Sequence, residues 1–219
     1  VAFPEMTSQA LNAVVKSWSD SAKLFKVINN TPYTEAKRSG SGWELKLTKE
    51  KSIKAKVLVL TGSAEKILAE LKVQTLNPAE TNTLNYADNI YRTTVGGIAG
   101  TANFLSLYSL LIPNQDNILY IKPDELEIGQ AAGATAAYAA FYQTKTSLSN
   151  LKQIQGELLN YKLPLMPFDD IKVADSNWLA IQKVGITGIL KGELSNGKVF
   201  FNPEKKVAYD EIRQPIKDY

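Results

Sequence analysis

An alanine-rich stretch with two glycines, residues 129–140 (GQAAGATAAYAA), constrains this chain more than any other segment. Alanine is the best helix former, whereas a glycine inside a helix costs roughly 1 kcal/mol, so Gly129 and Gly133 require a reason. A helix face without side chains lets another backbone or a flat ligand approach closely. Its first turn also offers unpaired N–H groups at the positive end of the helix dipole. The stretch therefore predicts a helix that faces either an electron-rich ligand edge or a closely packed backbone.

The composition excludes several classes of chemistry. The chain has 219 residues, no cysteine and no histidine, so disulfides, zinc–thiolate sites, thiol nucleophiles and histidine bases are excluded. A net charge of +3 gives no strong reason to expect a nucleic acid or an anionic membrane as a partner. No apolar run reaches transmembrane length. Any catalysis would depend on carboxylates, Lys, Tyr, Ser, Thr or a bound cofactor.

Hydrophobic periodicity predicts an α/β or α+β fold, in which helices pack on a mixed sheet. Strands are expected at 23–28, 33–48 (a hairpin), 53–61 and 117–121. Helices are expected at 4–17, 64–71, 125–143 and 147–159, the last with Ser147 or Ser149 as its N-cap. Two prolines near residue 164 suggest a boundary between a main domain, residues 1–163, and a small helical tail, residues 164–219.

Three short motifs have a structural explanation that outweighs the functional one. The glycines at 96, 97 and 100 lack a preceding buried strand and a Walker lysine, which favours a turn or a closely packed loop over a phosphate cradle. The acids at 124, 125 and 127 precede the alanine-rich helix and are explained as complements to its dipole. Thr61-Gly62 ends an apolar strand, where α/β folds place ligands, but many such turns bind nothing.

Taken in order, three segments resemble FAD-dependent oxidoreductases of the two-dinucleotide-binding-domain type. Residues 53–62 with the serine before them (SIKAKVLVLTG) resemble their charged–apolar strand that ends in Ala-Thr-Gly. Residues 111–119 contain the L-I-P and N-I-L of the segment that leads into their last sheet strand. Residues 128–137 (IGQAAGATAA) closely resemble their final G-Q-A-A-G-x-A-A helix. The resemblance extends over roughly residues 1–160 and implies a flavoprotein-like fold.

The resemblance also implies a cofactor and its contacts. In that family the N-terminus of the final helix points at the pyrimidine edge of the flavin, and small residues allow close approach. By this resemblance the cofactor is FAD, and its contacts are Thr61, Gly62, Gly129, Gln130, Ala131, Ala132 and Gly133. No catalytic acid or base and no metal ligand is implied.

The chain differs from the family in the motif that binds the ADP half of the cofactor. The family opens with a strand and a G-x-G-x-x-G turn that seat the ADP half of FAD, and neither occurs in this sequence. Without that turn and its helix dipole, the pyrophosphate loses its main anchor. We therefore expect a flavoprotein-like remnant that does not bind FAD tightly by itself. A missing N-terminal region or a second subunit would complete the site.

The tail resembles, in its spacing, a single degenerate S-layer-homology repeat. Such repeats are small helical units that, usually in threes, hold proteins on cell-wall polymers. The family's T-R-A-E is replaced here by Ala208-Tyr209-Asp210-Glu211, which lacks the arginine expected to meet an anionic polymer. The preferred alternative is a small apolar core packed on the main domain, formed by Trp178, Ile181, Phe200 and Phe201.

Two functions follow from these patterns. The first is an FAD-dependent oxidoreductase-like protein or fragment, in which the flavin would carry the redox chemistry. The second is a non-catalytic cell-envelope or interaction protein that retains the substrate half of the fold, since a fold does not by itself imply an activity. The tail favours a periplasmic or envelope location, whereas the absence of cysteine is compatible with either compartment.

Overall fold

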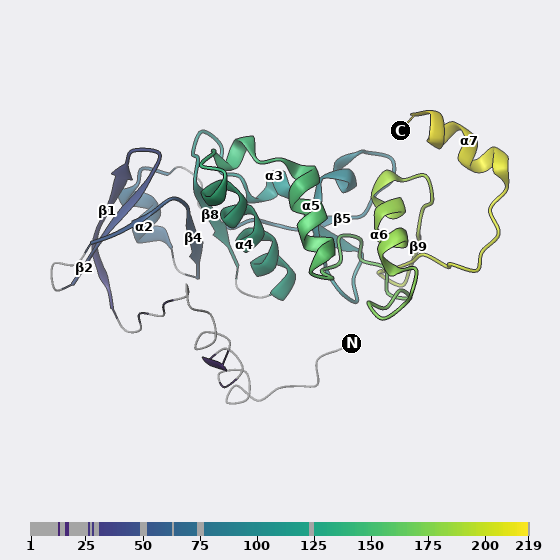
Figure 1. Ribbon diagram of the computed structural model, residues 1–219, viewed down its shortest axis with the longest axis horizontal. Coiled ribbons are helices and arrows are strands. Elements are labelled where there is room, and N and C mark those ends of the chain that lie inside the picture. The colour runs from purple at the N-terminus through teal and green to yellow at the C-terminus, as the bar shows by residue number, and fades with distance from the viewer. Residues whose placement is uncertain are drawn as a thin grey trace.

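We describe the protein from a computed structural model, which describes residues 13, 16–17, 26, 28, 31–48, 52–62, 64–73, 77–122 and 125–218. These residues form an α+β arrangement of helices and small sheets, as expected. Figure 1 shows the elements distributed along one long axis, with β1 and β2 near one end and α7 near the other. The expected helix 4–17 and strand 23–28 lie mostly outside the described residues.

An antiparallel sheet stands at one end of the molecule. It consists of β1 (Tyr33–Ser39), β2 (Gly42–Leu47) and β3 (Ser52–Ala55), paired in that order. The β1–β2 turn contains Gly40 at φ +60°, which confirms the expected hairpin. Trp43 of β2 is only 2% exposed and packs in a small core with Ile67 and Leu68 of α2 (Glu65–Glu70).

A parallel strand pair follows, separate from that sheet. β4 (Leu58–Thr61) pairs with β8 (Ile118–Ile121) in register from Leu58–Ile118 to Thr61–Ile121. Ala79 extends the pair beyond β8 through an isolated parallel bridge to Ile121. The expected strands therefore fall into two sheets rather than one mixed sheet. The chain bends at residues 56–57, between β3 and β4, so the antiparallel ladder does not continue into the parallel one.

A third sheet contains β5 (Asn82–Thr83), β7 (Asn103–Ser106) and β6 (Thr94–Gly97), in that order. The 3-10 helix η1 (Ile90–Thr93) precedes β6, and the short helix α3 (Leu107–Leu110) follows β7. Two of the three glycines expected in a turn thus lie in a strand. A Cβ on Gly97 would stand 2.6 Å from the carbonyl carbon of Met166, so close packing explains this glycine.

The alanine-rich stretch is helical, as predicted. α4 (Leu126–Phe141) follows β8, and α5 (Leu151–Asn160) packs beside it. The predicted N-cap of α5 is wrong: the cap is Asn150, whose side chain accepts a hydrogen bond from Gln153 N–H. Ser147 instead lies in the 3-10 helix η2 (Thr146–Leu148), which tertiary hydrogen bonds of Thr146 hold in place.

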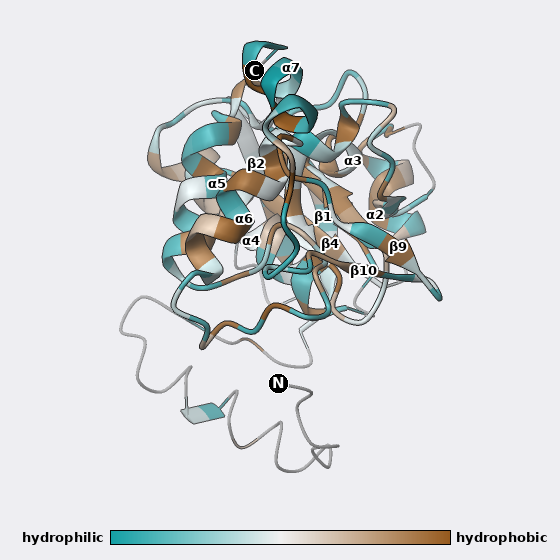
Figure 2. Cartoon of the chain, turned by 90° about the vertical axis from the view of Figure 1, so that its right-hand side faces the viewer, coloured by the Kyte–Doolittle hydropathy of each residue, from teal (hydrophilic) through white to brown (hydrophobic). Residues whose placement is uncertain are grey.

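Residues after 164 contain more than helices. They form α6 (Trp178–Thr187), an antiparallel hairpin of β9 (Glu193–Ser195) and β10 (Lys198–Phe200), and α7 (Tyr209–Asp218). Figure 2 shows α7 as mostly hydrophilic, and none of its residues is buried. Trp178 and Ile181 are buried as expected, but the hairpin register turns Val199 inward and leaves Phe200 half-buried.

The larger apolar core includes residues on both sides of the expected boundary at 163/164. It extends from Ala79 to Val199 and brings Phe104, Leu119 and Leu158 together with Met166 and Trp178 of the tail. The division into two domains stays a prediction, but the tail packs on the main core rather than standing apart.

Tyr86 connects the tail to the main core and makes a testable prediction about pH. Its hydroxyl accepts a hydrogen bond from Gly192 N–H at 3.0 Å, and its ring meets Tyr91 edge-on. Burial raises the pKa of Tyr86 to about 12. A raised tyrosine pKa stabilises the fold below pH 10, the ordinary value, and this contribution is lost as the pH rises from 10 towards 12. In an ultraviolet titration of tyrosinate absorption, the Tyr86→Phe variant should therefore lack one ionisation step near pH 12 that the unchanged protein shows. An unchanged titration curve in that variant would contradict the assignment.

Candidate functional site

The carboxyl ends of β4 and β8 meet at one edge of the parallel pair. Thr61 pairs with Ile121, so Gly62 lies beside Lys122, which follows β8. Gly62 adopts φ +68°, a left-handed conformation that glycine takes without strain. The hydroxyl of Tyr120 donates a hydrogen bond to the Gly62 carbonyl oxygen at 3.1 Å and holds this turn against the strand pair. Ligands of open α/β sheets bind at such edges.

The N-terminus of α4 opens beside that edge. α4 begins at Leu126, four residues after Lys122, and no side chain among the described residues caps its first turn. Glu127 lies in this turn, and its carboxylate accepts a hydrogen bond from Ala99 N–H at 3.5 Å. This acid therefore ties the helix to the β6–β7 connection and complements the helix dipole, as the structural explanation predicts. Asp124 lies outside the described residues.

The predicted cofactor contacts on α4 divide into two groups. Ala131 and Ala132 are fully buried and pack in the core with Leu119, so their side chains are not available to a ligand. Gly129 and Gly133 lie on the exposed side of the helix, and a Cβ on either would meet no atom within 4 Å. Gln130 is half-buried. Close packing among the described residues therefore does not explain the two glycines.

A cavity of about 330 Å³ lies on the other side of β8 from Gly62. It is lined by Ala79, Glu80, Thr81, Lys122, Glu125 and Ile128. Two carboxylates and one ammonium group therefore surround the start of α4 on this side. None of the seven residues predicted to contact FAD lines this cavity. β4, which ends at Thr61, pairs with the opposite edge of β8.

The glycines at 96, 97 and 100 do not form a phosphate cradle. Gly97 N–H donates to the Pro164 carbonyl at 2.9 Å, and Gly96 N–H donates to the Thr94 hydroxyl at 3.3 Å. Their main-chain donors are thus already used inside the protein. Gly100 adopts φ +73° in the turn that follows β6. Close packing explains Gly97 and backbone conformation explains Gly100, whereas a Cβ on Gly96 would meet only ordinary contacts.

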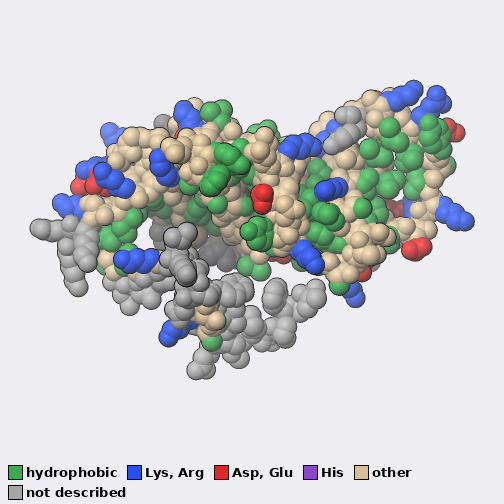
Figure 3. Space-filling view, viewed as in Figure 1, with side chains coloured by type: hydrophobic (Ala, Val, Ile, Leu, Met, Phe, Trp, Pro, Cys, Tyr) green, Lys and Arg blue, Asp and Glu red, His purple; other side chains and the backbone are tan. Residues whose placement is uncertain are grey.

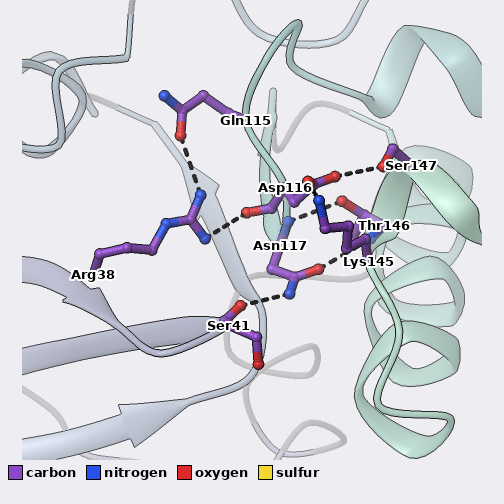
Figure 4. A network of polar contacts seen from close by, with 8 residues as sticks. All are labelled: Arg38, Ser41, Gln115, Asp116, Asn117, Lys145, Thr146 and Ser147. Atoms are coloured by element: carbon purple, nitrogen blue, oxygen red, sulfur yellow. Dashed lines mark hydrogen bonds and ion pairs between the residues drawn. The ribbon is translucent and has the colours of Figure 1, made fainter.

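A polar network that the sequence did not reveal joins the β1–β2 hairpin to the loops around β8 and α4 (Figure 4). Arg38 donates to the Asp116 carbonyl and stacks on Trp43, with its guanidinium carbon 3.8 Å from the ring centroid. Lys145 forms an ion pair with the Asp116 carboxylate at 3.1 Å. Burial raises the pKa of Asp116, but hydrogen bonds from Ser147 and Lys145 outweigh it and hold the pKa below its ordinary value.

The network ties the β1–β2 hairpin to the loops around β8 and α4. Its central residue is Asn117, which is 4% exposed and adopts φ +63°. The Asn117 amide donates to the Ser41 carbonyl at 2.7 Å and accepts from Thr146 N–H at 3.0 Å. The main-chain carbonyl oxygen of Asn117 accepts hydrogen bonds from Leu58 N–H and from the Trp43 indole N–H. Asparagine is the residue type that tolerates this left-handed conformation, which is the one signal the sequence offered.

The described residues at this edge can be compared with what the two halves of FAD require. The N-terminus of α4, which no described side chain caps, would suit the electron-rich edge of a flat ring, with Gly129 open beside it. The pyrophosphate needs several free main-chain donors, usually at a glycine-rich turn. In the described glycine-rich segment at 96–100, most main-chain donors are already used inside the protein. The part of the chain that the structure describes therefore offers no binding site for the adenosine and pyrophosphate half of FAD.

Comparisons of the chain with protein-family models, with curated proteins and with solved structures found no match. None of the described helices has the length and apolar character needed to cross a membrane. Within the described residues, no group of three or more acidic side chains is arranged to hold a metal ion.

Proposed function

We propose that this chain is a relative of the FAD-dependent oxidoreductases that contacts the flavin ring at the start of α4. One observation carries the proposal: the strand that ends in Thr61-Gly62 pairs in parallel with β8, and α4 begins directly after β8. Three segments that resemble the family in sequence thus adjoin one another in space. When bound, a flavin supplies two-electron redox chemistry.

In the proposed site, the residues of this chain bind the flavin ring and orient it. In this proposal the N–H groups of the first turn of α4 face the pyrimidine edge, where electron density accumulates. Gly129 leaves space for a flat ring against the helix, and the Gly62 turn, held by Tyr120, borders the same edge. We assign no acid or base in the proposed site.

The pyrophosphate and adenosine half of FAD is held elsewhere in this proposal. A region of the protein outside the described residues, or a second subunit, supplies the phosphate turn. The described chain then binds only the ring, so riboflavin, which lacks the phosphates and the adenosine, binds as well as FAD does.

A flavin titration tests the proposal. Adding riboflavin or FAD to the purified protein should shift the visible flavin absorption, with dissociation constants within about threefold of each other, because only the ring is contacted. Gly129→Leu, whose Cβ would meet no atom within 4 Å, should weaken binding of both at least about tenfold, or 1.4 kcal/mol. Gly156→Leu on α5, equally unhindered, is the matched control and should bind as the unchanged protein does.

The second candidate is a non-catalytic envelope or interaction protein. The missing phosphate seat and the tail that resembles an S-layer repeat favour it. A purified protein without visible absorption, and without a spectral shift at any flavin concentration, would refute the flavin proposal for this chain and leave this candidate.

A further inference from the structure

α7 follows a long exposed segment at one end of the molecule (Figure 1). Residues 203–208 are all exposed and contain no helix or strand. The chain just before them is fixed, because the Asp170 carboxylate accepts hydrogen bonds from Phe201 N–H at 2.8 Å and from Asn202 N–H at 2.7 Å. Residues 203–208 therefore form a tether between a fixed point at Asn202 and α7.

α7 is too short to be a stable helix by itself. It has ten residues, and isolated helices shorter than about 12–15 residues are marginal in water. Pro215 lies inside it and has no N–H to donate to the Glu211 carbonyl one turn earlier. A proline in a helix interior is strongly unfavourable. The helical conformation of this segment therefore depends on what α7 packs against.

One face of α7 lies over an apolar groove. Ile212 and Pro215 are half-buried, whereas the other residues described for this helix are exposed. These two residues are three apart and share a helix face. They line a cavity of about 290 Å³ together with Ile189, Leu190 and Phe201, which we call the groove. Figure 3 shows hydrophobic side chains together at this end of the molecule.

The contact between α7 and the groove is small. A cavity remains under the helix, so apolar atoms on its two sides lack full van der Waals partners. In the part of the chain that the structure describes, no hydrogen bond joins α7 to another helix or strand. Tyr209 is 69% exposed and Ile216 is 50% exposed. Few buried apolar contacts are typical of a segment that opens separately from the rest of a protein.

An ion pair on the tether reinforces this contact. The Lys205 ammonium donates a hydrogen bond to the Glu193 carboxylate of β9, and Glu211 of α7 attracts the same ammonium. The hydrogen bond to Glu193 and the two negative charges raise the pKa of Lys205. All three residues line the cavity. Exposed ion pairs contribute little to stability, so the apolar contact of Ile212 provides most of the attraction.

We propose that α7 is a strap that covers the groove and opens as a unit on its tether, while the rest of the fold stays intact. Opening removes Ile212 and Pro215 from the groove and exposes Ile189, Leu190 and Phe201 to the solvent. The released segment loses its helical structure, because no other contact supports it. None of these residues belongs to the proposed flavin site, so the strap does not depend on flavin binding.

Hydrogen exchange of the full chain measures this opening. The amides of Arg213 and Gln214 lie beyond the first turn of α7 and donate within the helix only while it is formed. We expect them to be protected at least about tenfold relative to an unstructured chain, because the helix is docked. They should also exchange at least about 100-fold faster than the amide of Leu158, on the buried face of α5, because α7 opens without global unfolding.

Two pairs of variants test what holds the strap closed. Ile212→Gln removes the apolar contact and should speed the exchange of the Gln214 amide at least about fivefold. Ile216→Gln is the same change on the exposed side and should leave that rate unchanged. Lys205→Gln removes the ammonium and should speed the exchange about two- to threefold. Its matched control is Lys206→Gln at the next position, which does not line the cavity and should have no effect.

Three results would overturn the proposal. One is exchange of the α7 amides as slow as that of Leu158, because the helix would then open only when the whole protein unfolds. Another is a complete lack of protection in the unchanged protein, because the helix would then not be docked. The third is equal exchange rates in Ile212→Gln and Ile216→Gln, because the groove would then not hold the helix.

Discussion

Replacing Gln182 with leucine should lower the free energy of unfolding by about 3–5 kcal/mol, because it leaves two buried main-chain donors without an acceptor. The Gln182 side chain is 1% exposed and lies on α6. Its carbonyl oxygen accepts from both Leu165 N–H and Met166 N–H at 2.8 Å, and its amide donates to the Met166 carbonyl at 3.2 Å. Each orphaned buried donor costs about 1–3 kcal/mol.

The segment held by Gln182 connects the tail with the main core. The Leu165 carbonyl accepts from the Thr94 hydroxyl at 2.7 Å, and the Pro164 carbonyl accepts from Gly97 N–H. Loss of Gln182 therefore loosens α6 from β6 as well. Urea denaturation measures the effect. The control is Gln153→Leu on α5, an exposed site where the change should remain within about 0.5 kcal/mol. A loss below about 1 kcal/mol in Gln182→Leu would contradict the role we assign to it.

Replacing Asn117 with alanine should lower the free energy of unfolding by about 2–4 kcal/mol. The change removes the acceptor of the buried Thr146 N–H and forces alanine into a left-handed conformation at φ +63°. The Ser41 carbonyl loses its donor too, but this residue is exposed and water can replace it. The same denaturation experiment measures the loss.

Two further variants separate these causes. Asn117→Gly removes the same side-chain hydrogen bonds without the backbone strain, so it should be about 1 kcal/mol more stable than Asn117→Ala. Asn117→Asp keeps an acceptor for Thr146 N–H and should destabilise less than the alanine variant. Equal stability of Asn117→Ala and the unchanged protein would show that the network in Figure 4 does not hold the hairpin to β8.

Elements with a strong local pattern were predictable. The alanine-rich stretch became α4, within about two residues at each end, because helix propensity acts over neighbouring residues. The apolar run before Thr61 became a strand, and residues 118–121 became a fully buried strand. Register was less predictable: Val199 rather than Phe200 turns inward, because the pairing of β9 and β10 decides which face points to the core.

The candidate site was predictable in part. The sequence indicated that Thr61-Gly62 and the start of α4 serve one site, and the parallel pairing of β4 with β8 places them at adjoining strand ends. It did not distinguish Ala131 and Ala132, which are buried, from Gly129 and Gly133, which are open, because the direction of a helix face depends on what packs beneath it. The chemistry of the flavin proposal remains a prediction for the titration to decide.

The sequence by itself determined the local elements and the excluded chemistry, since helix propensity and the absence of cysteine and histidine need no partner in space. The tertiary structure alone decided which segments meet. Asn117 bonds to Ser41 across 76 residues of sequence, and Gln155 bonds to Thr94 across 61. Such contacts depend on the closing of long loops and on desolvation of both partners, and neither leaves a repeating pattern in the chain.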